Sequence, residues 1–156
     1  MTDLVEIESI KRLKYKYLRC LDSKQWDELA KCFTTDVKTS FSGGAFSFDG
    51  PDAVIGFFKE GLPITRISMH HAHQGEIEIT SETTATGTWA LEDYLIDTEG
   101  NWSMRGAAFY HDKYVKIDGE WKIQATGYDR IFEEFWDRGK DPSLKLTQNM
   151  FAQKGT

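Results

Sequence analysis

The sequence predicts an α+β domain, because its helical and strand-like segments are separated along the chain. Apolar residues recur at helical spacing mainly before Pro63, and they alternate with polar residues in long runs after it. A strongly curved antiparallel sheet with three N-terminal helices across its open side would form a cone-shaped barrel. The interior of such a cone is a natural ligand pocket. The 156 residues fit one domain that covers positions 1–156.

Three helices are expected in the first part of the chain. The first spans residues 3–21, where apolar side chains spaced by three or four positions form one face. The second is short and covers residues 26–33. The third begins at Pro51, a residue favoured in the first helical turn, and ends near Gly61.

Two short strands are expected between the second and third helices, over residues 37–42 and 45–48. Four long strands follow the third helix, and Asp118-Gly119 is typical of a tight hairpin turn between the last two. The tail from about residue 137 is expected to be partly extended. The four long strands cover residues 67–80, 83–97, 102–117 and 121–132.

Composition narrows the classes of function. The formal net charge is −6 and no run of basic residues is present, so nucleic acid is not an expected partner. No apolar run approaches the length that spans a membrane. Cys20 and Cys32 form no CxxC pair and no secretory leader is recognised, which indicates reduced thiols in a cytoplasmic protein. Aromatic residues make up 13% of the chain, enough to line an apolar cavity.

Asp22 directly follows the apolar face of the first predicted helix. A carboxylate at a helix C-terminus is disfavoured by the helix dipole, so another group is expected to hold it, for instance a histidine. The simpler local interpretation is an ordinary cap for the helix that starts at Trp26.

Three histidines, His70, His71 and His73, lie in one predicted strand. Because side chains alternate between the two faces of a strand, His71 and His73 share one face and His70 lies on the other. A histidine on the concave side that faced Asp22 would be oriented and made more basic by the carboxylate. Alternatively, all three are exposed or simply hydrogen-bonded. No third residue has metal-ligand spacing, so no metal is expected.

Glu92 and Asp93 interrupt an apolar strand, so one of them must face inward. A buried carboxylate is costly unless it is paired, and Arg130 is the obvious cation on a neighbouring strand. A purely structural ion pair would explain these residues equally well as a catalytic role. Tyr17, Tyr110 and Tyr128 are core residues or hydrogen-bond donors, since a buried hydroxyl needs a partner.

Among sequence motifs, we find no phosphate-binding glycine loop, nucleophile motif or nucleotide fingerprint. What remains is a set of acid–base groups around an apolar pocket. Such a set suits proton abstraction next to a carbonyl, followed by elimination or isomerisation, without a cofactor.

Five groups of residues, in chain order, resemble the SnoaL-like group of the nuclear-transport-factor-like superfamily. Within that group they are most similar to the bacterial bile acid 7α-dehydratases. The resemblance extends over most of residues 5–150 and implies the cone-shaped α+β barrel. The matching groups are residues 16–22 with 26–29, 67–70, 84–89 with 91–93, 106–110 with 112–114, and 126–128 with 130–131.

The resemblance selects His70 from the three histidines and implies a functional set carried over residue by residue. The catalytic residues would be Tyr17, Asp22, His70, Asp93 and Arg130. Aromatic residues expected to bind the substrate are Tyr110, Tyr128, Trp89 and Phe109.

The implied activity is that of a cofactor-independent dehydratase, a hydro-lyase that removes water from a hydrophobic, steroid-like or bile-acid-like hydroxy-enone. In the bile acid enzymes the substrate is a coenzyme A thioester, whose tail would lie outside the cone mouth. Ketosteroid-type isomerisation, polyketide cyclisation or non-catalytic ligand binding on the same scaffold are alternatives. The aromatic content fits a homo-oligomer, and the resemblance implies a trimer.

Overall fold

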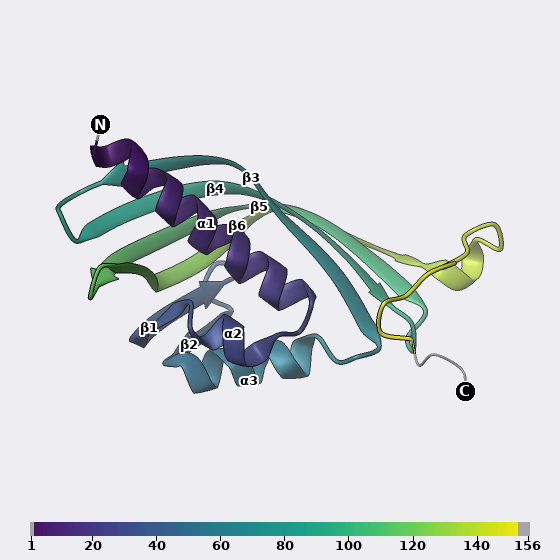
Figure 1. Cartoon of the computed structure of the whole chain (residues 1–156). Coiled ribbons are helices and arrows are strands. Elements are labelled where there is room, and N and C mark those ends of the chain that lie inside the picture. Colours follow the sequence, from purple (N-terminus) through teal and green to yellow (C-terminus); the bar gives the residue numbers. More distant parts are fainter. Residues whose placement is uncertain (1, 153–156) are drawn as a thin grey trace.

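The computed structural model describes residues 2–152 and confirms the predicted α+β cone, with three helices on the concave side of one six-stranded sheet (Figure 1). Within this range no helix combines the length and apolarity needed to cross a membrane. A 3-10 turn, Arg138–Lys140, follows the last strand. The elements are α1 (Thr2–Asp22), α2 (Trp26–Ala30), β1 (Phe33–Phe41), β2 (Phe46–Asp49), α3 (Pro51–Gly61), β3 (Arg66–Ile79), β4 (Thr84–Asp97), β5 (Trp102–Ile117) and β6 (Glu120–Asp137).

The sheet is mixed, with strand order β2-β1-β6-β5-β4-β3. Strands β3 to β6 form the expected antiparallel meander. β1, however, runs parallel to β6, with Phe41 opposite Tyr128, so the expectation of a wholly antiparallel sheet is wrong at this pair. The parallel pair arises because β2, α3 and β3 to β5 lie between β1 and β6 in the sequence, and β6 then returns beside β1. No local sequence pattern reveals such a connection.

Two element boundaries also differ from expectation. α2 ends at Ala30, and Phe33 begins β1 instead of ending the helix. The residues that follow Phe33 favour a strand because they include the β-branched Thr34 and Val37. At the other end of the chain, β6 continues to Asp137, five residues beyond the expected end.

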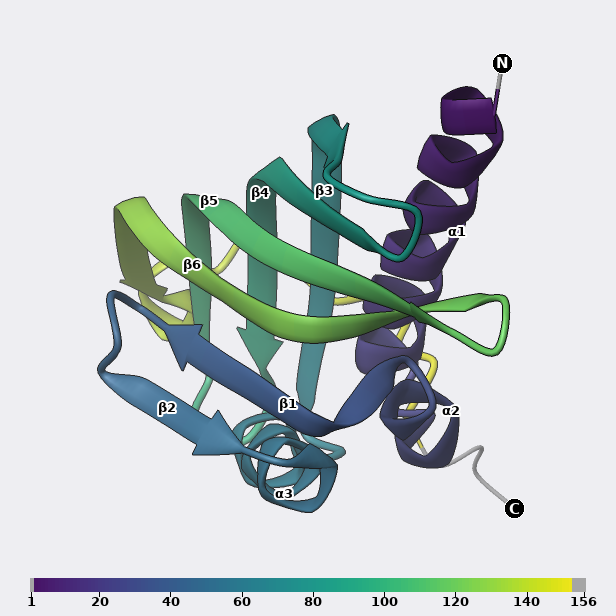
Figure 2. The same ribbon diagram turned by 90° about the vertical axis from the view of Figure 1, so that its left-hand side faces the viewer.

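α1 lies against β3, whereas α3 packs against β1 and β2 (Figure 2). One face of α1 is almost completely buried, with Ile10, Lys14, Tyr17 and Leu21 spaced by three or four positions. The helix ends because Lys24 adopts a left-handed φ of 56°, beyond which the Gln25 N–H donates to the Cys20 carbonyl. This termination places Asp22 at the end of the helix, beside β3.

β3 is irregular between Ala72 and Gly75, where Trp89 of β4 packs against it. A Cβ atom at Gly75 would lie 2.5–2.9 Å from three ring atoms of Trp89, closer than packed atoms allow. Trp89 cannot move aside easily, because it is 1% exposed and its indole N–H donates to the Tyr114 hydroxyl at 2.9 Å. Glycine is therefore required at position 75.

We predict that Gly75→Ala lowers the free energy of unfolding by about 1–3 kcal/mol, because the added methyl overpacks the Trp89 ring. Gly56→Ala in α3 is the matched control, since a Cβ there meets nothing within 4 Å. Alanine in a helix is favoured over glycine by roughly 0.5–1 kcal/mol, so the control should be stabilised. Urea unfolding curves of both variants test this, and equal midpoints would contradict it.

Candidate active site

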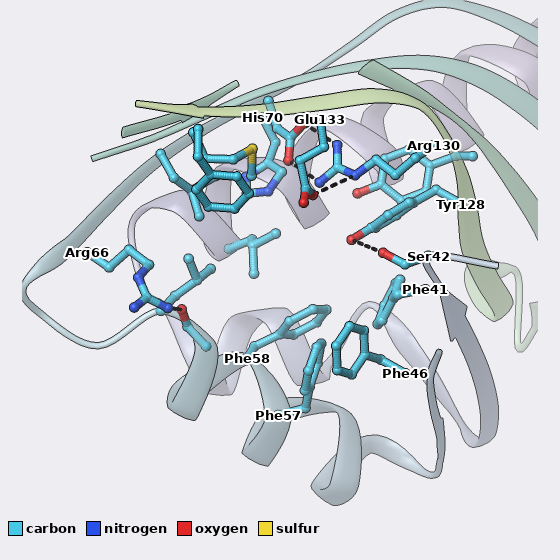
Figure 3. Close-up of a pocket in the computed structure, with 18 of the residues that line it drawn as sticks. Phe41, Ser42, Phe46, Phe57, Phe58, Arg66, His70, Tyr128, Arg130 and Glu133 are labelled. Carbon is cyan, nitrogen blue, oxygen red and sulfur yellow. Dashed lines mark hydrogen bonds and ion pairs between the residues drawn. The ribbon is translucent and has the colours of Figure 1, made fainter. Parts of the chain in front are cut away.

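A cavity of about 310 Å³ lies between the concave face of the sheet and α3 (Figure 3). Phenylalanine rings cover one side of the cavity, and a group of polar side chains lies on the facing side within an otherwise apolar lining that includes Leu95, Trp102, Met104 and Phe135. The aromatic side consists of Phe41, Phe46, Phe57 and Phe58, and the polar side carries His70, Tyr128, Arg130 and Glu133.

The structure brings Asp22 and His70 together at the junction of α1 and β3. His70 Nδ1 lies 2.6 Å from Asp22 Oδ1, and the His70 backbone N–H donates to Oδ2 at 2.8 Å. The Ser68 hydroxyl donates to Oδ1 at 2.8 Å. Because an ionised carboxylate only accepts hydrogen bonds, the shared proton belongs on Nδ1 and the Nε2 lone pair is free to act as a base. Three donors compensate a carboxylate that the helix dipole disfavours.

The structure also brings Asp93 and Arg130 together as a bidentate ion pair. Arg130 Nη1 and Nη2 donate to Asp93 Oδ1 and Oδ2 at 2.6 and 2.9 Å. Burial alone would lower the pKa of Arg130, but the hydrogen bonds and charge of Asp93 outweigh it and raise that pKa further. Asp93 is 3% exposed and lies opposite His70 in the register of β3 and β4. The paired carboxylate therefore sits next to the histidine in the sheet.

This ion pair crosses from β6 to β4 over Gly106 of the intervening strand β5. In the register, Gly106 lies opposite Asp93 on one side and Glu133 on the other. A Cβ atom at Gly106 would collide with Arg130 Nη1 and would lie 2.9 Å from Asp93 Oδ1. Only glycine leaves space for the guanidinium to reach across the strand.

Glu133 is a cavity residue that the sequence analysis missed. Strict alternation would turn Glu133 away from the face of Arg130, but the ladder between β5 and β6 shifts register between Ala107 and Ala108. Because of this bulge both side chains face the cavity, and Glu133 Oε2 lies 3.3 Å from Arg130 Nε. No sequence pattern marks the bulge, so the sequence does not show which face of β6 the residues beyond Arg130 occupy.

Three predicted tyrosines line the cavity. Tyr17 is fully buried, and within residues 2–152 its hydroxyl makes no hydrogen bond of standard geometry and has only Tyr110 as a weak partner. Burial and the nearby Asp112 charge raise the pKa of Tyr17, so the phenol stays neutral. Tyr110 is 2% exposed, and Tyr128 shares a long contact of 3.5 Å with the Ser42 hydroxyl. The phenols are placed to donate hydrogen bonds to a ligand.

Two predicted substrate-binding residues lie elsewhere. Phe109 is on the outer face of the sheet and is 44% exposed, because it neighbours the inward Tyr110 on the same strand. Trp89 does face the helices, but it packs over Gly75 at the part of the sheet that α1 covers and does not line the cavity. The structure therefore does not place these two side chains in the lining of the cavity.

The remaining histidines of β3 face away from the cavity. His71 and His73 stack with ring centroids 5.6 Å apart, and His73 Nε2 lies 3.2 Å from Glu92 on the outer face. Across residues 2–152, no group of three His, Cys, Asp or Glu side chains is arranged to hold a metal ion.

Arg66, at the end of the cavity away from Arg130, is bound by the protein itself (Figure 3). Its Nε and Nη2 donate to Asp97 Oδ2 at 2.9 and 2.7 Å, and Nη1 donates to the Gly61 carbonyl at 2.7 Å. Burial would raise the pKa of Asp97, but the Gly100 N–H and Arg66 outweigh it and hold that pKa below its usual value. At this end of the cavity the charge of Arg66 is thus compensated by an ion pair.

These features define a small α+β cone protein with a histidine–carboxylate pair at the wall of a largely apolar cavity. Residues 2–127 match the model of the SnoaL-like domain. The chain belongs to the SnoaL-like family.

Solved structures with the same fold cover most of this chain. A candidate scytalone dehydratase from Novosphingobium aromaticivorans is 28% identical over 86% of this chain and 91% of that chain, with a TM-score of 0.78. Hexachlorocyclohexane dehydrochlorinase LinA-type3 from Novosphingobium barchaimii is 21% identical over 86% and 92%, with a TM-score of 0.77. A Mycobacterium tuberculosis protein of unknown function is 23% identical over 93% and 80%, with a TM-score of 0.74. The last two likenesses establish the fold alone.

We predict that Gly106→Ala displaces the Arg130 guanidinium from Asp93 and lowers the free energy of unfolding by about 1–3 kcal/mol. Side-chain NMR should show the Arg130 guanidinium protons exchanging with water, whereas in the unaltered protein the paired protons are protected. Gly56→Ala again serves as control and should leave the Arg130 signals unchanged. Retention of protected Arg130 signals in Gly106→Ala would show that the crossing does not need glycine.

Proposed function

We propose that this protein is a cofactor-independent hydro-lyase that eliminates water from a hydrophobic, steroid-like hydroxy-enone. The observation that carries the proposal is the Asp22–His70 pair, which leaves a basic Nε2 at the wall of an apolar cavity. A carbonyl conjugated with a double bond acidifies a neighbouring C–H bond, and a base of this kind can remove that proton. The similarity to a candidate scytalone dehydratase, at 28% identity, supports a dehydration.

In the proposed reaction His70 Nε2 takes the proton and Asp22 stabilises the resulting imidazolium, as the 2.6 Å contact to Nδ1 allows. The electron pair moves through the conjugated system and expels the hydroxyl group as water. The imidazolium supplies the proton that the leaving oxygen needs, either directly or through the neutral Tyr17 phenol, which the imidazolium then reprotonates. The dienolate oxygen would accept a hydrogen bond from a phenol, and one such donor is commonly worth about 2.7–4 kcal/mol.

Asp93 and Arg130 would act beside the Asp22–His70 pair. They would hold the positive charge of the guanidinium in a fixed position at the cavity wall. Arg130 is 17% exposed at its side chain and lines the cavity, so its guanidinium can face a substrate oxygen while Asp93 holds it in place. Bidentate pairing fixes the plane of the guanidinium and favours a defined orientation.

The cavity favours a compact apolar substrate. Its volume of about 310 Å³ is at the lower end of the range for ligand pockets, and phenylalanine rings cover one side. A fused-ring enone fits that description. A coenzyme A tail, if the substrate carries one, would extend outside the cavity.

We predict that the purified protein removes one water from a 7α-hydroxy-3-oxo-4-ene steroid, presented free and as its coenzyme A thioester, with mass spectrometry as the readout. His70→Ala should lower the rate by about 10²–10⁴, the usual contribution of a general base. His71→Ala is the matched control, because that side chain faces outward, and its rate should be unchanged.

The outcomes separate the candidate reactions. A product of unchanged mass with a moved double bond would replace dehydration by isomerisation with the same base. Equal rates for His70→Ala and the unaltered protein would overturn the assignment of His70. Tight binding of the steroid without turnover would favour a ligand-binding protein on this scaffold.

We also propose a homo-oligomer, a trimer on the basis of family resemblance, that buries the outer face of the sheet. Phe109, Ile131 and Phe132 are exposed there by 44, 59 and 45%, around a groove that includes Ala90 and Ala107. Neighbouring exposed apolar side chains of this size usually mark an interface.

Light scattering coupled to size exclusion should therefore give three times the mass of one chain. Ile131→Glu should shift the population to smaller species, because it places a charge in the apolar patch. Ile64→Glu is the control, since Ile64 is similarly exposed, by 58%, between α3 and β3. A monomer at high protein concentration would refute this proposal.

A further inference from the structure

A second polar cluster lies buried between α1 and the sheet, and its members are outside the proposed reaction. Lys14 of α1 and Asp112 of β5 are 0 and 2% exposed, and Lys14 Nζ donates to Asp112 Oδ2 at 2.7 Å. The free-energy cost of removing two charges from water can equal or exceed the attraction between them, so stability alone does not explain a buried ion pair.

The Asp112 carboxylate accepts hydrogen bonds from two side chains besides Lys14. The Tyr114 hydroxyl donates to Oδ2 at 2.7 Å, and the Thr126 hydroxyl donates to Oδ1 at 2.6 Å. The carboxylate is therefore fixed in the sheet, with hydrogen bonds from two strands besides the lysine.

The Lys14 ammonium, by contrast, donates one side-chain hydrogen bond and otherwise contacts two aromatic rings. Its Nζ atom lies 3.5 Å from the centroid of the Tyr110 ring and 4.9 Å from that of the Tyr17 ring. Burial lowers the pKa of Lys14, and Asp112 opposes that shift by favouring the ammonium. The side chain brings a positive charge onto the faces of two tyrosines that both line the cavity.

The Tyr17 hydroxyl is the connection between this cluster and the cavity. An unpartnered buried hydroxyl costs roughly 1–3 kcal/mol, so it is a position where a ligand oxygen would be favoured. A cation on the face of a phenol draws electron density from the ring and makes the O–H a stronger donor, whereas a nearby anion has the opposite effect.

We infer that Lys14 and Asp112 are positioning residues that set, with opposite signs, how strongly Tyr17 and Tyr110 donate hydrogen bonds to an anionic oxygen in the cavity. Lys14 strengthens the donors and Asp112 weakens them. The ligand class is a planar enolate or phenolate, in which negative charge resides on an oxygen attached to a flat ring. The inference rests on the proposed function only in taking the cavity as the place where such an oxyanion forms.

A purely structural role for the pair makes a different prediction. Removing either partner leaves the other charge buried and uncompensated, so a structural pair would weaken ligand binding in both variants. The electrostatic role requires Lys14→Met to lower an oxyanion readout. It also requires Asp112→Asn to raise that readout when it is placed in the Lys14→Arg background, because a guanidinium stays charged without the carboxylate that favours the Lys14 ammonium. The sign of the second variant therefore separates the two explanations.

The experiment uses 2-naphthol as a probe, because its absorbance spectrum distinguishes bound naphthol from bound naphtholate and no turnover is needed. At fixed pH, the naphtholate-to-naphthol ratio in the complex should fall about three- to tenfold in Lys14→Met. It should rise by a similar factor from Lys14→Arg to Lys14→Arg/Asp112→Asn. Tyr17→Phe should lower the ratio as well, because it deletes one donor. Lys16→Met is the matched control, since that partly exposed lysine pairs with Glu28 at the surface, and it should leave the ratio unchanged.

Further variants keep the test decisive. Lys14→Arg retains the cation and should restore most of the ratio. If Lys14→Met does not fold, the double variant Lys14→Met/Asp112→Asn replaces it, and its ratio should lie below that of Lys14→Arg/Asp112→Asn. A fall in both comparisons, no change in either, or failure of naphthol to bind the unaltered protein would overturn the inference. Loss of the steroid dehydration with these shifts intact would refute only the substrate assignment.

Discussion

The attachment of Asp22 to β3 is the contact on which the site depends. The Asp22 carboxylate ends α1 and accepts hydrogen bonds from the Ser68 hydroxyl, the His70 backbone and the His70 ring. One side chain thereby fixes the position of the helix end relative to the sheet, the orientation of the imidazole and the tautomer of its neutral form. The helix dipole disfavours an isolated carboxylate at this position, and the three donors compensate for that cost.

Much of the fold could be read from the sequence because its signals are local. The periodicity of the first helix, Pro51 at the start of α3 and the hairpin at Asp118-Gly119 each depend on neighbouring residues, and the corresponding elements are present. The parallel pairing of β1 with β6 depends on residues about ninety positions apart, so no window of sequence contains it. The early end of α2 was missed for a related reason, since Phe33 is drawn into the sheet by its pairing with Ile123.

The site residues could be predicted where side chains alternate strictly between the two faces of a strand. They could not be predicted where a bulge interrupts that alternation. Alternation required one of Glu92 and Asp93 to face inward, and the inward residue is Asp93. The same rule should have excluded Phe109 once Tyr110 was placed inside, because adjacent residues on a strand point to opposite faces. Glu133 could not be found in this way, since a bulge in β6 changes the phase of the strand just before it. The choice of His70 over its neighbours came from family resemblance and not from spacing.

The pairing of β1 with the last strand has a consequence for the order in which this molecule can be made. During synthesis the N-terminal end emerges first, yet β1 has only the short β2 beside it until residues 123–128 have left the ribosome. Up to that moment one edge of β1 exposes unpaired backbone groups. Contacts so distant in sequence close slowly, so the chain is exposed to aggregation and proteolysis until β6 has been made. A nascent chain stalled before β6 would therefore lack both Arg130 and the strand that joins β1 to the rest of the sheet, and the cavity would form only after β6 has been made.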